Sequence, residues 1–203
     1  MHAYMEQFKT HSGQADSGTG TGALSAYAAG QDGVVGYVDL EQVAGPAVVR
    51  ITLWDTEESA IGFAATRELT LPAGGLYELT DTASGAAASQ VPSHARLLYF
   101  DGPRTPEQDA AADFGGRHRV WPAIRDLDGI VGMALLHAGD LGVVVITFAT
   151  SVETLDAAGR AAMATELLPG EDLALLPGPD RIELHHVTGY QMPAPSSATN
   201  IAE

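Results

Sequence analysis

The residues best suited to chemistry lie on one short apolar segment, residues 48–54. If this segment is a strand, its side chains alternate and Arg50, Thr52 and Trp54 share one face. A guanidinium can stabilise an anion or oxyanion, and an indole ring can form the stacking wall of a pocket. The same pattern fits a structural role, in which Trp54 covers the core and Arg50 pairs with an acid at its rim. Arg50 and Trp54 are candidate catalytic residues under the first interpretation.

A second group of polar side chains lies on the neighbouring apolar segment, residues 34–40. Tyr37, Asp39 and Glu41 alternate onto one face of that strand. Tyr37 or Asp39 could act as an acid or base on a phenolic substrate, because general acid–base catalysis needs a titratable group within hydrogen-bond reach. The alternative is a solvated edge or a face between two units of the fold.

The histidines do not form a metal-binding pattern. No pair has the three- or four-residue helical spacing of a zinc site. The adjacent His185 and His186 would point to opposite faces of a strand, so they cannot both bind one metal ion. We therefore predict no metal site. The seven histidines are His2, His11, His94, His118, His137, His185 and His186.

An internal match indicates how these segments are organised. Residues 32–40 (DGVVGYVDL) recur as residues 128–136 (DGIVGMALL), with five of nine positions identical. In the same order, residues 48–54 (VVRITLW) match residues 143–149 (VVVITFA). The two shifts differ by one residue, so the pattern predicts a duplicated unit of about 95 residues, too long a period for a solenoid array.

The second copy shows its elements most clearly. Thr105-Pro106-Glu107-Gln108 places a Thr cap before Pro and an acid, which is a strong helix start. We predict that this helix breaks at Gly115-Gly116 and resumes through Trp121. The remaining predicted elements are strands 97–100, 130–136 and 142–148, a helix over 154–168 and a closing strand over 181–187.

The first copy follows the same plan. The predicted elements are strands 1–8, 34–40, 48–54 and 76–79, a helix over 23–29 and another that starts at 56–59. Small-residue composition predicts a mobile segment over 12–22. The predicted organisation is a first repeat over 1–82, a linker over 83–94, a second repeat over 95–192 and a disordered tail over 193–203.

Each copy therefore reads as strand, helix, strand, strand, helix, strand. This order is the split βαβ or ferredoxin-like arrangement, an antiparallel sheet with helices on one face, so the fold class is α+β. The hairpin strands are apolar on both faces, which means that the face without helices must also be covered. Two tandem units can cover it by packing their sheets face to face within one chain.

Composition excludes several classes of function. The net charge of −16 comes from 26 acidic residues against ten basic ones, so nucleic acid is not expected as a partner. The longest apolar run, residues 141–148, is much shorter than a membrane span, and no secretory signal opens the chain. Without cysteine there is no disulfide or thiolate site. We expect a cytoplasmic, acidic protein with no membrane partner.

Residues 51–60 (ITLWDTEESA) and 121–124 (WPAI) leading into 128–132 (DGIVG) resemble the dimeric α/β-barrel superfamily, most closely its antibiotic-biosynthesis-monooxygenase-like branch. The resemblance implies that the two repeats form an intramolecular version of the dimeric barrel. It also implies that the face bearing Trp54 lies toward the helices and lines a pocket. The matching positions of the second copy are Val145, Thr147 and Ala149, so we expect any pocket chemistry to lie in the first repeat.

The chain departs from the motifs of that superfamily's oxygenating and haem-degrading members. They use an Asn on the opening strand and a His on the helix after the Trp, whereas Asn200 is the sole Asn here and residues 56–71 contain no His. For the superfamily's haem enzymes, the resemblance leaves three candidate axial ligands, namely His137, His185 and His186.

The leading hypothesis is a protein that binds a small aromatic or polyketide-like molecule and acts as a cofactor-independent monooxygenase. One alternative is a non-catalytic binding or structural protein that has lost the site, and a second is a haem-binding member. We assign no cofactor. The sequence leaves open whether the pseudo-dimer associates into a further homodimer.

Overall fold

The structure is a computed structural model that describes residues 1–9, 30–66, 75–139 and 142–193 of the 203-residue chain. The predicted helix over 23–29, the predicted mobile segment over 12–22 and all but the first residue of the predicted tail over 193–203 lie outside the described residues.

Eight strands cross the described part of the chain: β1 (His2–Lys9), β2 (Val34–Gln42), β3 (Ala47–Trp54), β4 (Gly75–Ser84), β5 (His94–Asp101), β6 (Ile130–Ala138), β7 (Gly142–Ala149) and β8 (Arg181–Gln191). The helical elements are α2 (Glu57–Thr66), α3 (Pro106–Gly115), the π-helical turn η1 (Gly116–Val120), α4 (Trp121–Ile124), α5 (Val152–Met163) and the 3₁₀ turn η2 (Leu173–Leu175). No helix in these described ranges has both the length and the apolar character that a membrane span requires.

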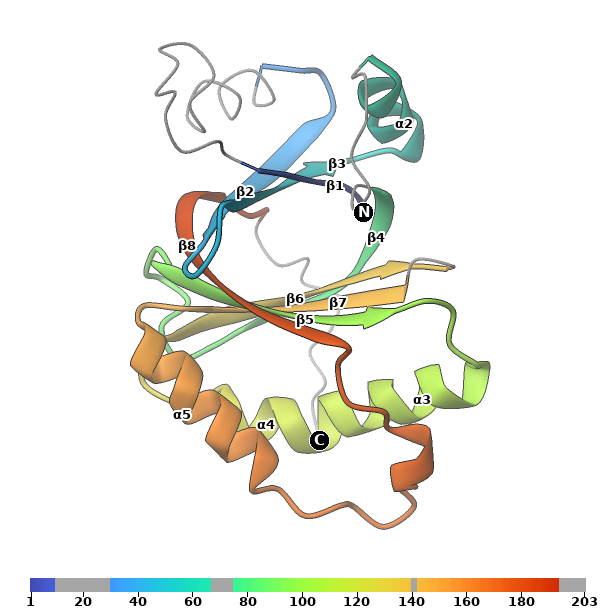
Figure 1. Cartoon of the computed structure of the whole chain (residues 1–203), viewed down its shortest axis with the longest axis vertical. Coiled ribbons are helices and arrows are strands. Elements are labelled where there is room, and N and C mark those ends of the chain that lie inside the picture. Colours follow the sequence, from blue (N-terminus) through green and yellow to red (C-terminus); the bar gives the residue numbers. More distant parts are fainter. Residues whose placement is uncertain (10–29, 67–74, 140–141, 194–203) are drawn as a thin grey trace.

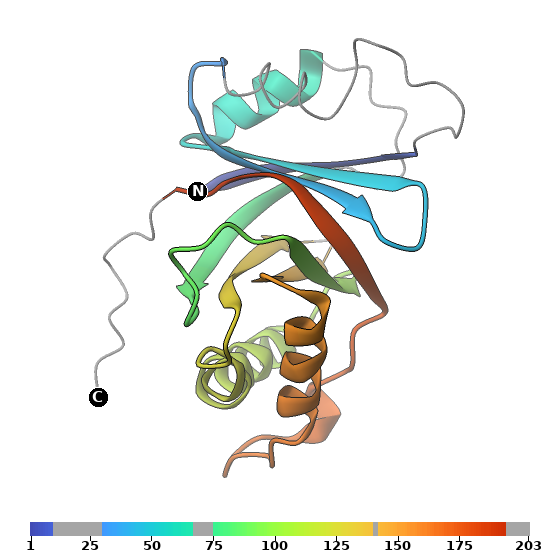
Figure 2. The ribbon, with the colours of Figure 1, turned by 90° about the vertical axis from the view of Figure 1, so that its left-hand side faces the viewer.

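The strands form one closed antiparallel barrel in the order β1-β3-β2-β8-β5-β7-β6-β4. Within it, β4-β1-β3-β2 and β8-β5-β7-β6 are the two predicted ferredoxin-like sheets, and β2–β8 and β4–β6 pairing joins them at both edges. Helix α2 covers the first sheet from outside, and α3, α4 and α5 cover the second, so the barrel lies between two helical layers (Figures 1 and 2). The predicted α+β fold is confirmed.

Matching details recur in the two halves. Gly33 and Gly129 both have a left-handed backbone, with φ of 89° and 87°, just before β2 and β6. Each of these strands then has a register irregularity, at residues 34–36 and 130–132. The repeated motif thus encodes a turn that only glycine adopts at low cost, followed by a bulge. These matches support the predicted repeat.

Strand alternation divides β3 as predicted. Val49, Ile51 and Leu53 face the barrel interior, where they join the main apolar cluster. Trp54 faces outward and packs with Phe63 of α2. All eight residues of β3 are buried, because one face contacts the other repeat and the opposite face is covered from outside.

Strand β4 and the connection that follows it differ in extent from the sequence prediction. β4 runs over Gly75–Ser84 rather than 76–79, because it pairs with β1 only as far as Glu78 and then continues along β6 of the other repeat. Segment 85–93 joins it to β5, which begins at His94. Pairing with a distant strand has no local sequence signal, so the extension could not be read from residues 76–84.

The predicted break in the first helix of the second repeat is instead a π-helical turn. The Thr105 capping box is present, and the helix continues through η1 into α4, with the Trp121 N–H donating to the Gly116 carbonyl. Pro122 has no N–H, and in an α-helix its ring would crowd the carbonyl four residues earlier. A wider π turn immediately before Pro122 relieves that crowding, so the helix changes its winding without ending.

Helix α5 is shorter than predicted, spanning Val152–Met163 instead of 154–168. Ser151 is its cap, since its hydroxyl accepts the Thr154 N–H at 3.1 Å. At the other end, the Thr165 hydroxyl donates to the Ala162 carbonyl at 2.7 Å. A side chain thus satisfies a carbonyl of the last turn, and the helix ends there.

Candidate functional site

The candidate residues of the first repeat are buried, except for Tyr37, which is partly exposed. Arg50 and Asp39 are each 1% exposed, and Arg50 Nε donates to Asp39 Oδ1 at 2.6 Å. Trp54 Nε1 donates to Thr52 Oγ1 at 3.1 Å. Tyr37 lies next to Asp39 against Gly189 of β8. This is the arrangement that the structural interpretation describes, and a catalytic role for Arg50, Trp54, Tyr37 or Asp39 stays a prediction.

Arg50 is the centre of a charged row that crosses the first sheet. Its register partners are Glu6 on β1 and Asp39 on β2, and all three residues are at most 2% exposed. Buried charges are tolerated only when they are paired, so this row ties β1, β3 and β2 together.

The equivalent row of the second sheet is apolar. Val145 on β7 has Leu98 on β5 and Leu135 on β6 as its register partners. All three side chains face the helices and line a cavity, and each is only partly buried. The same place in the duplicated sheet is therefore filled by charges in one repeat and left as an apolar floor in the other.

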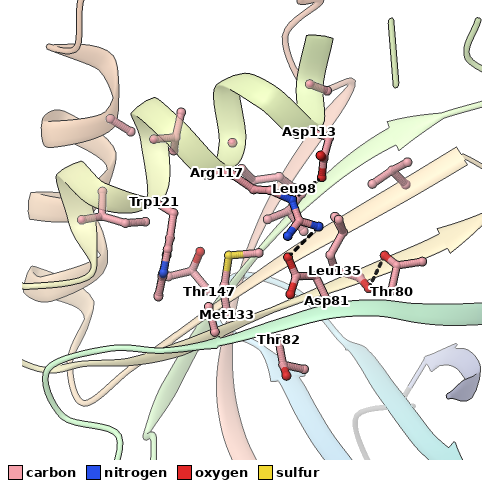
Figure 3. A pocket seen from close by; sticks show the side chains of 18 of the residues that line it. Thr80, Asp81, Thr82, Leu98, Asp113, Arg117, Trp121, Met133, Leu135 and Thr147 are labelled. Atoms are coloured by element: carbon pink, nitrogen blue, oxygen red, sulfur yellow. Dashed lines mark hydrogen bonds and ion pairs between the residues drawn. The ribbon is translucent and has the colours of Figure 1, made fainter. Parts of the chain in front are cut away.

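The cavity has a volume of about 1400 Å³ and lies between the second sheet and the helices α3, α4 and α5. Figure 3 shows Leu98, Met133 and Leu135 rising from the sheet toward Arg117 and Trp121 on the helix side. The hypothesis from sequence placed pocket chemistry in the first repeat, whereas this cavity, lined by described residues, is in the second. A volume of this size accommodates a ligand of several fused rings.

Small side chains on the helices create the space. The helix positions that line the cavity include Ala112, Gly116, Ala158, Gly159 and Ala162. Large side chains at these positions would fill the layer between helix and sheet, as Trp54 and Phe63 do beneath α2. The π turn η1 lies along the cavity, and such turns are frequent at functional sites.

One ion-pair network spans the cavity wall. Arg117 on η1 bonds Asp113 on α3 at 2.6 Å and Asp81 on β4 at 3.1 Å (Figure 3). A register shift in β4 after Leu79 turns Asp81 toward this side of the sheet, and bulges often re-aim a side chain in this way. The hydrogen bond that Arg117 Nε donates to Asp113 Oδ1 is the main cause that raises the pKa of Arg117. A strand of the first repeat thus contributes Asp81 to the cavity of the second.

A second polar group lines the cavity around Asp109. Its Oδ1 lies 3.5 Å from Arg104 Nε, and its Oδ2 lies 3.7 Å from His137 Nε2. Asp109 and His137 are each close to 40% exposed, so solvent and ligand can reach them. Carboxylate and imidazole in this relation can orient each other for proton transfer.

The connection after α5 closes part of the cavity wall. Arg119 Nε donates to both oxygens of Glu171, at 3.0 and 2.8 Å, and Arg119 Nη1 donates to Thr165 at 2.8 Å. The bond from Arg119 is the main cause that lowers the pKa of Glu171, and the Leu168 N–H adds to it. These bonds fix the loop 164–172 against the π turn.

The three alternative candidates for an axial haem ligand lie in different places. His137 lines the cavity, His185 is fully buried beside Glu183 on the barrel side of β8, and His186 packs on His94 with ring centroids 4.7 Å apart. Burial is the main cause that lowers the pKa of His94, and the neighbouring His186 is the second. Among the described residues, no group of three or more metal-binding side chains converges.

Sequence reasoning missed Asp81, Arg104, Asp109 and Arg117 as cavity residues. Asp81 depends on a bulge and on pairing across repeats, neither of which leaves a local pattern. A usable signal did exist in the helices, where small residues recur on the face that opposes the Leu- and Val-rich strands. Such a pairing of small with medium-sized side chains indicates a gap between the layers.

Comparison with known proteins gives a fold-level answer. Neither a protein-family model nor a curated protein sequence matches the chain. Solved structures that match almost the whole chain include an anthrone oxidase-like protein (TM-score 0.61, 14% identity, 94% of this chain and 92% of the other). A candidate monooxygenase from Fusobacterium nucleatum has a TM-score of 0.64 at 10% identity, covering 96% of this chain and 95% of the other.

A variant chlorite dismutase from Candidatus Nitrospira defluvii is also similar, with a TM-score of 0.55 and 11% identity over 93% of this chain and 91% of the other. At these identities the likeness concerns the fold and not the activity. The resemblance inferred from the sequence is confirmed at that level. The chain has the dimeric α/β-barrel fold, built from two ferredoxin-like repeats in one polypeptide.

Proposed function

We propose that the protein binds an aromatic small molecule in the cavity of the second repeat and oxidises it with molecular oxygen, without a bound cofactor. The observation that carries the proposal is the cavity itself, which combines an apolar floor with ionisable groups along its wall. This combination is typical of small-molecule sites. The similarity to anthrone oxidase-like and monooxygenase-like structures makes oxygenation of an aromatic compound the first reaction to test.

In this proposal, His137 accepts a proton from the bound substrate, and Asp109 orients the imidazole ring of His137. The two groups are 3.7 Å apart and both are exposed to the cavity, so the pairing requires that they approach to hydrogen-bond distance when a ligand binds. Arg117 offers a guanidinium about one helical turn further along the same wall, since its partner Asp113 follows Asp109 by four residues on α3, and there it can stabilise a developing oxyanion. Leu98, Met133 and Trp121 would hold the ring system and exclude water from the carbanion.

The reaction balances without an external reductant. Loss of a proton from an activated CH₂ group leaves a carbanion, which transfers electrons to O₂ and forms the C–O bond of a hydroperoxide. Loss of the second C–H proton and cleavage of the O–O bond then give a ketone and one water molecule. The substrate carbon supplies all four electrons, so one oxygen atom enters the product and the other enters water.

The second candidate is binding without turnover. It is favoured by the pairing of the cavity carboxylates, because Asp81 and Asp113 both bond Arg117 and Asp109 lies near Arg104. A carboxylate whose oxygens already accept hydrogen bonds from a guanidinium has fewer lone pairs free to receive a substrate proton. Ligand binding with no oxygen uptake would select this candidate over the first.

The test compares tryptophan substitutions on two faces of helix α3. A112W places an indole in the cavity, whereas A110W places it on the exposed side of the same helix. We expect calorimetric binding of neutral naphthalene-sized ligands, such as 2-naphthamide, to wild type and A110W but not to A112W. Oxygen uptake with anthrone should follow the same order. Equal binding by both variants, or no binding by wild type, contradicts the proposed site, and a Soret band in the isolated protein would favour the haem alternative.

A further inference from the structure

Arg104, which connects β5 to α3, differs from the other charged residues of the cavity. Its side chain is 10% exposed and its guanidinium carbon lies 5.2 Å from the centre of the Phe100 ring. Its Nε is fully buried and has no hydrogen-bond partner among the described residues. The nearest carboxylate oxygen, Asp109 Oδ1, is 3.5 Å away, which is an ion-pair distance and not a good hydrogen bond.

The other arginines of the cavity are satisfied in one of two ways. Arg96, Arg117 and Arg119 have carboxylate partners at 2.9, 2.6 and 2.8 Å. Arg125 has a weaker partner at 3.5 Å, but its side chain is 53% exposed, so water solvates it. Arg104 alone among these five combines burial with a distant partner. A buried charged donor without an acceptor is unfavourable, and an acceptor supplied by a ligand would relieve this.

The charge distribution favours an anion as that acceptor. The chain has a net charge of −16 and nine arginines, yet five of those arginines line this one cavity against three aspartates. Four of the five have a carboxylate partner at 3.5 Å or less that holds no second cation of the cavity, so the least compensated positive charge of the wall is Arg104. Asp109 compensates Arg104 only in part, because its nearer oxygen is 3.5 Å from Arg104 Nε and its other oxygen is directed toward His137 at 3.7 Å.

We propose that Arg104 is the docking point for a carboxylate, so that the ligand of the cavity is an aromatic acid. This proposal rests on the proposed function, because it assumes that the cavity is the ligand site. The guanidinium is planar and its two Nη atoms form a pair of donors that matches the two oxygens of a carboxylate, and the added negative charge also compensates the buried Nε. Docking of the carboxylate at Arg104 places the attached ring over the floor formed by Phe100 and Leu98.

The test compares two probes that differ only in charge. 2-Naphthoate and 2-naphthamide have the same ring system, and calorimetry measures their affinity for wild type, R104Q, R104K and the control R160Q, whose side chain is exposed on α5 away from the cavity. We expect wild type and R160Q to bind the carboxylate about ten- to a hundredfold more tightly than the amide, as a charged hydrogen bond implies. In R104Q this preference should disappear while amide affinity stays the same. R104K should keep only part of it, because it retains the charge but loses the planar pair of donors.

The outcomes separate this proposal from the proposed function. If wild type binds both probes equally, or if R104Q keeps the preference, the carboxylate proposal is wrong while the aromatic cavity stands. If wild type binds neither probe, both proposals fail. Melting curves identify any variant that is unfolded, and R104K provides the same comparison if R104Q does not fold.

Discussion

Replacement of Asp39 by Ala should destabilise the protein strongly and leave its ligand cavity intact. Asp39 and Arg50 are each 1% exposed, with 2.6 Å between Nε and Oδ1. Removing one partner of a buried ion pair costs about 3–5 kcal/mol, because the remaining charge is left in an apolar environment. Buried Glu6, the other register partner of Arg50, still offers a negative charge, so we expect the lower half of that range.

The magnitude translates into a clear thermal shift. For a chain of this size, each kcal/mol corresponds to about 2–4 °C in melting temperature, so D39A should melt roughly 6–16 °C below wild type. Equilibrium urea unfolding gives the free energy directly, and the two tryptophans report on different repeats, since Trp54 lies beneath α2 and Trp121 beside the cavity. E41A is the matched control, because Glu41 is exposed on the same strand and its loss should cost less than about 0.5 kcal/mol.

The same variant distinguishes a structural Arg50 from a catalytic one. If the row is structural, D39A keeps the affinity of wild type for 2-naphthoate below its melting temperature. A cost under about 1 kcal/mol, together with loss of oxygen uptake, would refute the reasoning and return the chemistry to the first repeat.

Two further predictions concern the barrel and the repeated turn. The hydrogen bond from His185 is the main cause that lowers the pKa of Glu183, so its stabilising effect is present above its unfolded pKa near 4.5 and is lost as pH falls through the lower folded value. E183Q should therefore lower the free energy of unfolding by about 1–2 kcal/mol at pH 7, and the difference from wild type should shrink below pH 4 in urea titrations. G129A should lower the melting temperature, because φ is 87° and a Cβ would meet two threonine hydroxyls at 2.6 and 2.7 Å. G62A, a helical glycine with open space at its Cβ, should raise it through helix propensity, and a melting temperature that moves the same way in both variants would contradict this.

The sequence carries the fold well because the fold depends on local patterns. Alternation in residues 48–54, the Thr105 cap and the repeated Asp-Gly turn each specify their own backbone, and the structure contains all three. The extension of β4 and the bulge that turns Asp81 depend on pairing with β6, whose partner residues are about fifty positions away in the sequence. Contacts of that kind leave no periodicity in either segment, so the cavity wall could not be assembled from sequence.

The difference between the predicted pocket position and the observed cavity has a more specific cause. Sequence reasoning sought polar and aromatic residues, and it found them at Arg50 and Trp54. In the folded chain both side chains already have close partners: Arg50 bonds Asp39, and Trp54 packs on Phe63. Val145 occupies the position in the second sheet that Arg50 occupies in the first. Its side chain has no polar group that needs a partner, so no neighbouring side chain has to pack against it.

That contrast indicates how two copies of one sheet can serve different purposes, one for stability and the other for ligand binding. A charged row needs close partners, because each unpaired member would be unfavourable in a buried layer, and it therefore selects tight packing on its own face. An apolar row tolerates a gap above it at the smaller cost of lost dispersion contacts, and a ligand can restore those contacts. The first repeat thus holds the barrel together around Arg50, and the second can keep Leu98, Val145 and Leu135 accessible without losing the fold. Charging Val145 should consequently close or distort the cavity more than the barrel, whereas neutralising Arg50 should do the reverse.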